Sequence, residues 1–121
     1  MNYELPNIIN TFIDALNSQN EQVFINCLTD DAYVYDAGRY IIGADAIRYW
    51  ITSEAFAYNV YMQFDSAKKH YNDYILTLKM SGDYDKNLAP DPTYMDYHFT
   101  LADDKICKIY ILLNNHITQI R

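Results

Sequence analysis

The chain has 121 residues, half of them apolar, and its 16 acidic residues against nine Lys and Arg residues give a formal net charge of −7. This length suits one domain with one hydrophobic core, and the apolar content argues against intrinsic disorder. The acidic balance disfavours nucleic-acid binding, because the chain as a whole would repel a phosphate backbone. We therefore expect a single domain over residues 1–121.

No part of the sequence has the pattern of a membrane segment. The N-terminal stretch MNYELPNII has neither a basic region nor a long apolar run, which argues against a signal peptide, and no stretch approaches the length of a membrane span. Cys27 and Cys107 are far apart in sequence and each is flanked by apolar residues, so two buried thiols are favoured over a disulfide. A cytoplasmic protein that does not contact membranes is the expectation.

The first half of the sequence has helical periodicity in three places. Apolar residues recur with helical spacing over residues 5–18, again from Val23 to Leu28, and a third time from Gly43 to about Ala55. Each recurrence is confined to one helical face. The sequence therefore predicts three amphipathic helices, of which the first two form a closely linked antiparallel pair.

A short hairpin is expected between the second and third helices. Asp30 and Asp31 end the helical pair, and residues 32–36 form a short strand. The pair Ala37-Gly38 turns the chain, and residues 39–42 form the second short strand.

The second half of the sequence alternates apolar and polar residues with the period of a strand. The alternating runs cover residues 58–64, 73–81, 94–101 and 106–113, with residues 68–72 and 82–92 as turns. Asp103-Asp104 predicts a tight hairpin between the last two strands. Four consecutive strands joined by turns form an antiparallel meander, and helices followed by such a sheet give an α+β layered fold.

One face of this sheet should pack on the helices and leave the other face open. The open face carries a mixed, weakly charged set, namely Tyr61, Ile75, Thr77, Thr100, Tyr110 and Leu112. A half-apolar outer face invites a partner, and we expect a homodimer through it. Single apolar residues scattered over a solvated face are the alternative.

Asp36 is the candidate functional carboxylate of the hairpin. By strand parity it shares a face with Ala32 and Val34. If that face is the core face, the carboxylate points into an apolar pocket, where carboxylates are rare without a partner or a function. A proton acceptor or an acceptor for a ligand hydroxyl is the functional interpretation. A side chain that caps the following turn is the structural one.

The stretches FIDALNSQNEQVFINCLTDDAYVYDAG and GADAIRYW, with this order of elements, resemble the nuclear-transport-factor-2-like superfamily, in its SnoaL-like and ketosteroid-isomerase-like branch. The resemblance implies a cone-shaped barrel (a cystatin-like roll) in which three N-terminal helices pack on a curved, mostly antiparallel sheet. Members bind small apolar molecules in the cone. Some are isomerases, cyclases, dehydratases or hydrolases and others only bind or dimerise, so the fold does not define the function.

The resemblance also assigns roles to positions. Asp36 matches the general base of ketosteroid isomerases, whose oxyanion hole combines a Tyr with a protonated Asp. The position of that Tyr is Phe12 here, which cannot donate a hydrogen bond and argues against the same reaction. The second donor is Asp96 or Tyr97, depending on the alignment of the last hairpin. Strand parity favours Tyr97, because it shares the apolar face of Phe99.

The expected pocket combines the catalytic candidates Asp36 and Tyr97 with an apolar lining. That lining is expected to be Phe12, Leu16, Val34, Trp50, Tyr58, Tyr74 and Phe99. An open cone should hold a cavity of about 300 Å³ or more, the size that a drug-sized ligand needs, whereas a cone filled by its own side chains should not.

Neither a metal nor another cofactor is expected. The three histidines His70, His98 and His116 show no ligand spacing, and the sequence has no Gly-rich phosphate-binding loop. The sequence thus predicts a protein that binds a small apolar or aromatic ligand in its cone. An isomerase- or cyclase-type enzyme with Asp36 as base and a non-catalytic homodimerisation module are the alternatives.

Overall fold

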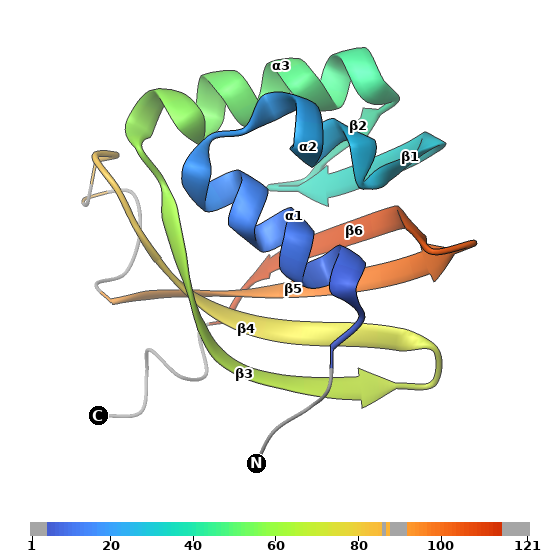
Figure 1. The fold of residues 1–121 in the computed structure, drawn as a ribbon. Helices are drawn as coiled ribbons and strands as arrows, with labels where there is room; N and C mark the ends of the chain where they lie inside the picture. Colours follow the sequence, from blue (N-terminus) through green and yellow to red (C-terminus); the bar gives the residue numbers. More distant parts are fainter. Residues whose placement is uncertain (1–4, 86, 88–91, 115–121) are drawn as a thin grey trace.

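The computed structural model describes residues 5–85, 87 and 92–114. Three α-helices and a short 3-10 helix lie on one side of a six-stranded sheet in this part of the chain (Figure 1). The helices are α1 (Asn7–Ser18), α2 (Glu21–Asn26), α3 (Ala44–Glu54) and the 3-10 helix η1 (Phe56–Tyr58). The strands are β1 (Leu28–Asp36), β2 (Arg39–Ile42), β3 (Tyr61–His70), β4 (Asp73–Ser81), β5 (Thr93–Ala102) and β6 (Lys105–Leu113).

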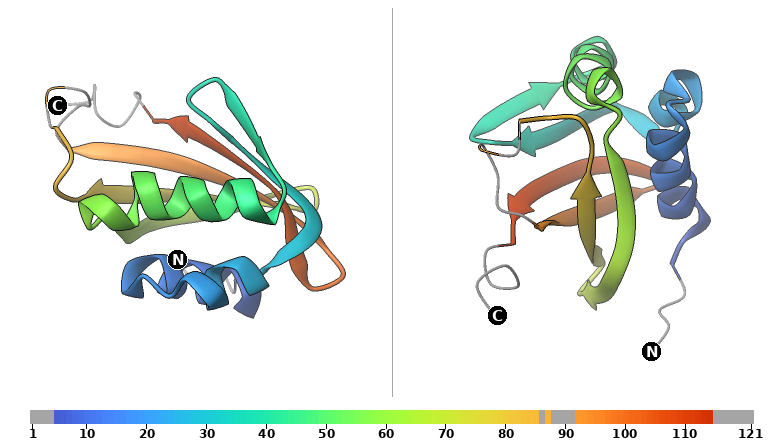
Figure 2. Two further views of the ribbon diagram at one scale, coloured as in Figure 1. Left: turned by 90° about the horizontal axis from the view of Figure 1, so that it is seen from above. Right: turned by 90° about the vertical axis from the view of Figure 1, so that its left-hand side faces the viewer.

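The sheet has the strand order β2-β1-β6-β5-β4-β3 and curves around the helices (Figure 2). Strands β3 to β6 form the predicted antiparallel meander, and the predicted α+β fold with a curved sheet is confirmed. Strand β1 pairs with β6 in parallel, which joins the N-terminal hairpin to the meander. The sequence did not predict this junction, because periodicity identifies a strand but not its neighbour.

The boundary between α2 and β1 differs from the prediction. Asn20 caps α2, since its side chain accepts a hydrogen bond from the Val23 N–H at 3.2 Å. The helix ends at Asn26, however, and Leu28 begins the strand instead of extending the helix. Leu28 pairs with Ile106 of β6, so tertiary pairing overrides the helical spacing of this short segment.

Strand β3 also differs from its prediction at both ends. It runs through residues 68–70, which were expected in a turn, and its predicted first residue, Tyr58, belongs to η1. A register shift between Phe64 and Ser66 lets the strand continue, since a bulge absorbs one residue and restores pairing beyond it.

A bulge in β6 corrects the face expected for Cys107. The register shifts so that Thr100 pairs with Lys108 but Leu101 pairs with Ile106, which leaves Cys107 as the extra residue. Its thiol donates to the Thr100 carbonyl at 3.4 Å, while Ile106 takes the buried position. Both cysteines are free thiols.

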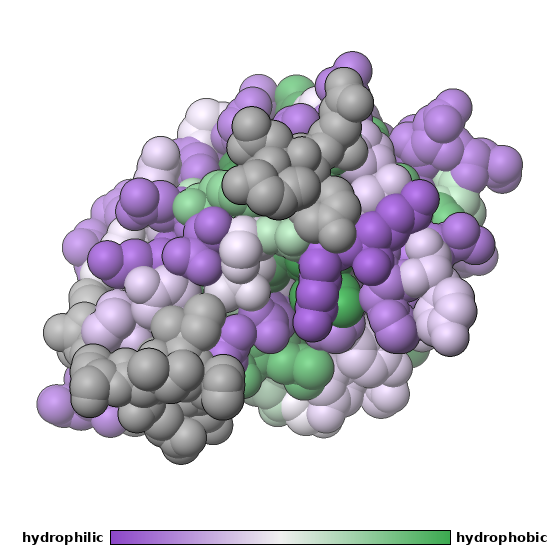
Figure 3. All heavy atoms as spheres, turned by 90° about the horizontal axis from the view of Figure 1, so that it is seen from below, coloured by the Kyte–Doolittle hydropathy of each residue, from purple (hydrophilic) through white to green (hydrophobic). Residues whose placement is uncertain are grey.

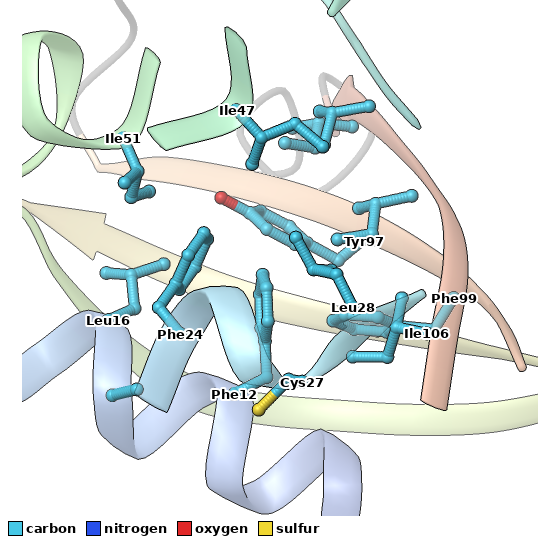
Figure 4. Packing of buried hydrophobic residues seen from close by; sticks show 14 of the residues in the cluster. Phe12, Leu16, Phe24, Cys27, Leu28, Ile47, Ile51, Tyr97, Phe99 and Ile106 are labelled. Atoms are coloured by element: carbon cyan, nitrogen blue, oxygen red, sulfur yellow. The ribbon is translucent and has the colours of Figure 1, made fainter. Parts of the chain in front are cut away.

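Aromatic rings form the centre of the core between α1, α2 and β5 (Figure 4). Phe12 lies with its ring centroid 4.5 Å from that of Phe24 and 5.4 Å from that of Phe99. All three side chains are fully buried. No helix among the described residues has the length and apolar character needed to cross a membrane.

Candidate functional site

A cavity of about 170 Å³ lies at the end of the core where α3 meets η1 and the inner sheet face. Its lining residues are Leu16, Asp36, Trp50, Ile51, Glu54, Ala55, Val60, Met62, Met80, Met95, Tyr97 and Ile111. The volume is below the roughly 300 Å³ expected for a drug-sized ligand. It is close to the volume of an engineered cavity of about 150 Å³ that binds benzene. The site therefore suits a molecule of about that size.

The structure brings four of the nine predicted site residues to this cavity: Asp36, Tyr97, Leu16 and Trp50. The other five lie elsewhere. Phe12, Val34 and Phe99 are wholly enclosed in the core and do not line the cavity, because neighbouring core side chains cover them on every side. Tyr58 is 46% exposed on η1. Tyr74 lies near the far end of β4, under the Lys69 ammonium at 5.5 Å from the ring centroid.

Three methionines form much of the wall that sequence reasoning missed. Met62 and Met80 are cross-strand partners on β3 and β4, and Met95 is on β5. Strand parity places Met62 and Met80 on the inner face. This parity is the sequence signal that could have identified them as cavity-lining residues. Glu54 was missed as well, although it follows Trp50 by four residues and so shares its helical face.

Sheet register sets Asp36 and Tyr97 on either side of one residue. Asp36 of β1 and Tyr97 of β5 both pair with Ile111 of β6, and all three side chains line the cavity. Adjacent strands are about 4.8 Å apart, so the two polar residues are separated by about 10 Å across the strands. A small molecule placed over Ile111 can contact both.

The Asp36 carboxylate is held by two donors on one of its oxygens. The Trp50 indole Nε1–H donates to Oδ2 at 3.0 Å, and the Arg39 Nη2–H donates to the same oxygen at 3.3 Å. Oδ1 has no hydrogen-bond partner among the described residues. The side chain is 21% exposed. One carboxylate oxygen is thus fixed and the other is free to accept from a ligand.

The turn after Asp36 sets the position of Arg39. Ala37 and Gly38 both adopt left-handed conformations, with φ of 54° and 79°. They form the turn between Asp36 and Arg39, which are cross-strand partners in the β1–β2 hairpin. Ala37 has a Cβ, so this conformation costs on the order of 1–2 kcal/mol. The tight turn brings the guanidinium back over the carboxylate of the residue three positions earlier.

Arg39 is shared between two carboxylates of the site. Besides Asp36, it donates through Nη1 and Nη2 to both Glu54 oxygens at 2.9 Å each. This hydrogen-bonded fork lowers the pKa of Glu54 and raises that of Arg39. Arg39 and Glu54 are each about half exposed, so they form the solvent side of the site.

Tyr97 is the buried hydroxyl of the site. The residue is 4% exposed, and its ring extends from β5 so that the hydroxyl points toward α3 (Figure 4). Burial, with a smaller effect from the nearby Asp36 charge, raises the pKa of Tyr97 above its usual value. It is a protonated donor at neutral pH.

The Tyr97 hydroxyl has no hydrogen-bond partner among the residues that the structure describes. No fully enclosed polar side-chain atom in this part of the chain lacks a partner, so the hydroxyl borders open space in the cavity. Asp96, the alternative donor, lies on the outer face, where it accepts from Thr77 at 2.7 Å and Asn114 at 3.0 Å. Tyr97 therefore faces the cavity.

No metal-binding cluster occurs among the described residues. His98 lies on the outer sheet face, where burial lowers its pKa, and His70 contacts the ring of Tyr71 at 4.7 Å between centroids. His116 lies outside the described residues.

Solved structures identify the fold. A putative polyketide cyclase from Sinorhizobium meliloti has a TM-score of 0.81 and 24% identity, with 89% of this chain and 95% of that chain covered. An NTF2-like (nuclear-transport-factor-2-like) protein of unknown function from Cytophaga hutchinsonii has a TM-score of 0.74 and 12% identity, with 97% of each chain covered. The chain has the nuclear-transport-factor-2-like fold.

A third neighbour extends the comparison to a ligand complex. A hypothetical protein with a ketosteroid isomerase-like fold from Catenulispora acidiphila, solved with trimethylamine, has a TM-score of 0.74 and 18% identity, with 90% of this chain and 86% of that chain covered. No protein-family model and no curated protein matches this sequence. Since these identities are all below 25%, the likeness establishes the nuclear-transport-factor-2-like fold and leaves the function open.

The raised pKa of Tyr97 predicts a loss of stability at alkaline pH. Above about pH 10 this tyrosine ionises in the unfolded chain but stays protonated in the folded protein, so rising pH favours unfolding. The slope is at most about 1.4 kcal/mol per pH unit. Tyr97→Phe should lose less stability than the wild type between pH 9 and 11, measured by urea unfolding followed by circular dichroism.

Tyr71→Phe is the matched control, because Tyr71 is 87% exposed and its hydroxyl is solvated in both states. It should follow the pH dependence of the wild type. Parallel curves for the wild type and Tyr97→Phe would contradict the burial of the hydroxyl as the cause.

Proposed function

We propose that this protein binds a small molecule in the cone cavity, with an apolar body about the size of a benzene ring and one polar group directed at Asp36 and Tyr97. The observation that carries the proposal is the pair of unsatisfied groups at the cavity, the Tyr97 hydroxyl and Asp36 Oδ1. Both groups border the open space of the cavity, where a ligand with a polar end could hydrogen-bond to both.

The remaining lining supports the same proposal. Apart from Asp36, Glu54, Tyr97 and the indole nitrogen of Trp50, it consists of aliphatic and methionine side chains. Methionine adapts its shape to irregular apolar partners. The neighbour from Catenulispora acidiphila was solved with trimethylamine, a molecule that would fit a cavity of this volume.

A proton-transfer enzyme is the second candidate, favoured by the arrangement of Asp36. Its free oxygen can take a proton while Trp50 and Arg39 hold the other, and Tyr97 can donate to an oxygen on the substrate. Phe12 is enclosed by Phe24 and Phe99, so α1 supplies no donor at that position. An isomerisation or cyclisation would then depend on Asp36 as base and Tyr97 as oxyanion donor.

A homodimer through the outer sheet face is the partner we propose. A tyrosine cluster covers the outer side of β2, β1 and β6: Tyr33, Tyr35, Tyr40 and Tyr110 have neighbouring ring centroids 4.9 to 6.3 Å apart. Ile42 beside it is 68% exposed and Leu112 is 44% exposed. Figure 3, which shows the molecule from below, has apolar side chains among polar ones on that face. Burial of the tyrosine cluster by a second copy would remove this apolar area from water.

Ligand binding is tested by filling the cavity. Trp50 is the only tryptophan of the chain, and its indole N–H is a single NMR signal at the site. Titration with phenol should shift that signal saturably in the wild type. Ala55→Leu places a larger side chain in the lining and should weaken phenol binding about tenfold or more. The cavity is close in size to a benzene ring, so the added side chain would fill the space that the ligand needs. Ala57→Leu, on the exposed side of η1, should bind as the wild type does. Equal binding by both variants would refute the proposal.

Proton transfer is tested with a simple ketone. The wild type should accelerate exchange of the α-protons of cyclopentanone with deuterium oxide, followed by proton NMR. Asp36→Asn should lower the exchange rate by about 10²–10⁴-fold, the usual contribution of a general base. Asp103→Asn, which changes net charge equally in the β5–β6 turn, should have no effect. Unchanged exchange in Asp36→Asn, with a native circular dichroism spectrum, would remove this candidate.

The homodimer is tested by sedimentation velocity. The wild type should sediment as a dimer, and the double variant Tyr40→Ser/Ile42→Lys should be a monomer because it removes apolar area and places a charge on the outer face. Tyr49→Lys alters a residue that is 74% exposed on α3, on the opposite side of the sheet, and should remain dimeric. A monomeric wild type would refute the interface.

A further inference from the structure

We infer that the ligand of the cone cavity is a small organic cation, an apolar body that carries one ammonium group. This inference rests on the proposed function and adds the charge of the molecule that the cavity selects. It follows from the charge balance of the lining, from the occupied donors and from the free acceptors.

The charge balance of the cavity is negative. Asp36 and Glu54 are the carboxylates of its lining, and Arg39 is the only cation among the described residues that bonds to either of them. Tyr97 stays neutral, so the lining with its arginine carries about one net negative charge. A charge beside an apolar cavity acts more strongly than one in water, because the local dielectric constant is lower.

Apart from the Tyr97 hydroxyl, the donors at the cavity that an anionic ligand would need are already in use. The Trp50 indole N–H is bonded to Asp36, and both Nη atoms of Arg39 are bonded to Glu54 or Asp36. An anion would find one free donor, the Tyr97 hydroxyl, unless it broke these bonds, and it would lie beside two carboxylates. A cation needs no such rearrangement.

The free groups of the cavity suit an ammonium group. Asp36 Oδ1 has no partner within the described part of the chain, and the oxygen of the Tyr97 hydroxyl, on a residue that is 4% exposed, can accept a second hydrogen bond. An N–H donor bound over Ile111 would reach toward both. Trp50 lines the same space, and indole rings attract cations more strongly than other aromatic side chains do.

Three probes with one tert-butyl body separate charge from shape: tert-butylamine, which is a cation at pH 7, tert-butanol and pivalate. Each is titrated into the full chain at low ionic strength, and binding is read from the NMR signal of the Trp50 indole N–H. We expect tert-butylammonium to bind about tenfold or more tightly than tert-butanol, as a charge-assisted hydrogen bond implies, and pivalate to bind weakest.

The variants locate the cause of this selectivity. Asp36→Asn keeps the shape of the side chain and should bring tert-butylammonium to within about threefold of tert-butanol. Asp103→Asn makes the same change in net charge in the β5–β6 turn and should retain the wild-type preference. Equal or tighter binding of tert-butanol or pivalate by the wild type would overturn the inference while leaving the proposed function in place. Absence of saturable binding by any probe would refute both.

Discussion

The parallel pairing of β1 with β6 is the constraint on which the site depends. It joins a hairpin to an otherwise continuous meander, and its register places Asp36 beside Ile111, which in turn lies beside Tyr97. A shift of one residue would turn Asp36 to the outer face, because side chains alternate along a strand. Cys107 lies between two paired stretches of β6, at the point where the register with both β1 and β5 shifts.

A carboxylate next to an apolar cavity must be stabilised by its surroundings. Here the stabilising groups come from two elements, the Trp50 indole from α3 and the Arg39 guanidinium from β2. Both act on Oδ2 alone. A turn short enough to bring Arg39 over Asp36 requires the strained backbone conformation of Ala37. The result is a carboxylate with one oxygen anchored and one available.

Sequence reasoning predicted the layers and part of the site because both depend on local periodicity. Strand parity indicated the inner face for Asp36 and distinguished Tyr97 from Asp96, and the hairpin at Asp103-Asp104 follows from turn chemistry alone. Periodicity could not show how deeply an inward side chain lies. Phe12 faces inward as expected, but it is enclosed by other aromatic rings and does not line the cavity. Pairings between distant segments, such as Leu28 with Ile106, depend on tertiary packing that no local pattern encodes.

The size of the cavity follows from how the aromatic residues are distributed. Phe12, Phe24 and Phe99 fill the middle of the cone, so the cavity that Asp36 and Tyr97 line lies at the end where α3 and η1 meet the sheet. The polar groups at that end come from β1, β5 and α3, and the residue on α1 that lines it is the aliphatic Leu16. Any chemistry at this site must therefore use Asp36 and Tyr97 without a donor from the first helix. The same packing that stabilises the core thus leaves only a small space at this end, beside the Asp36 carboxylate and the Tyr97 hydroxyl.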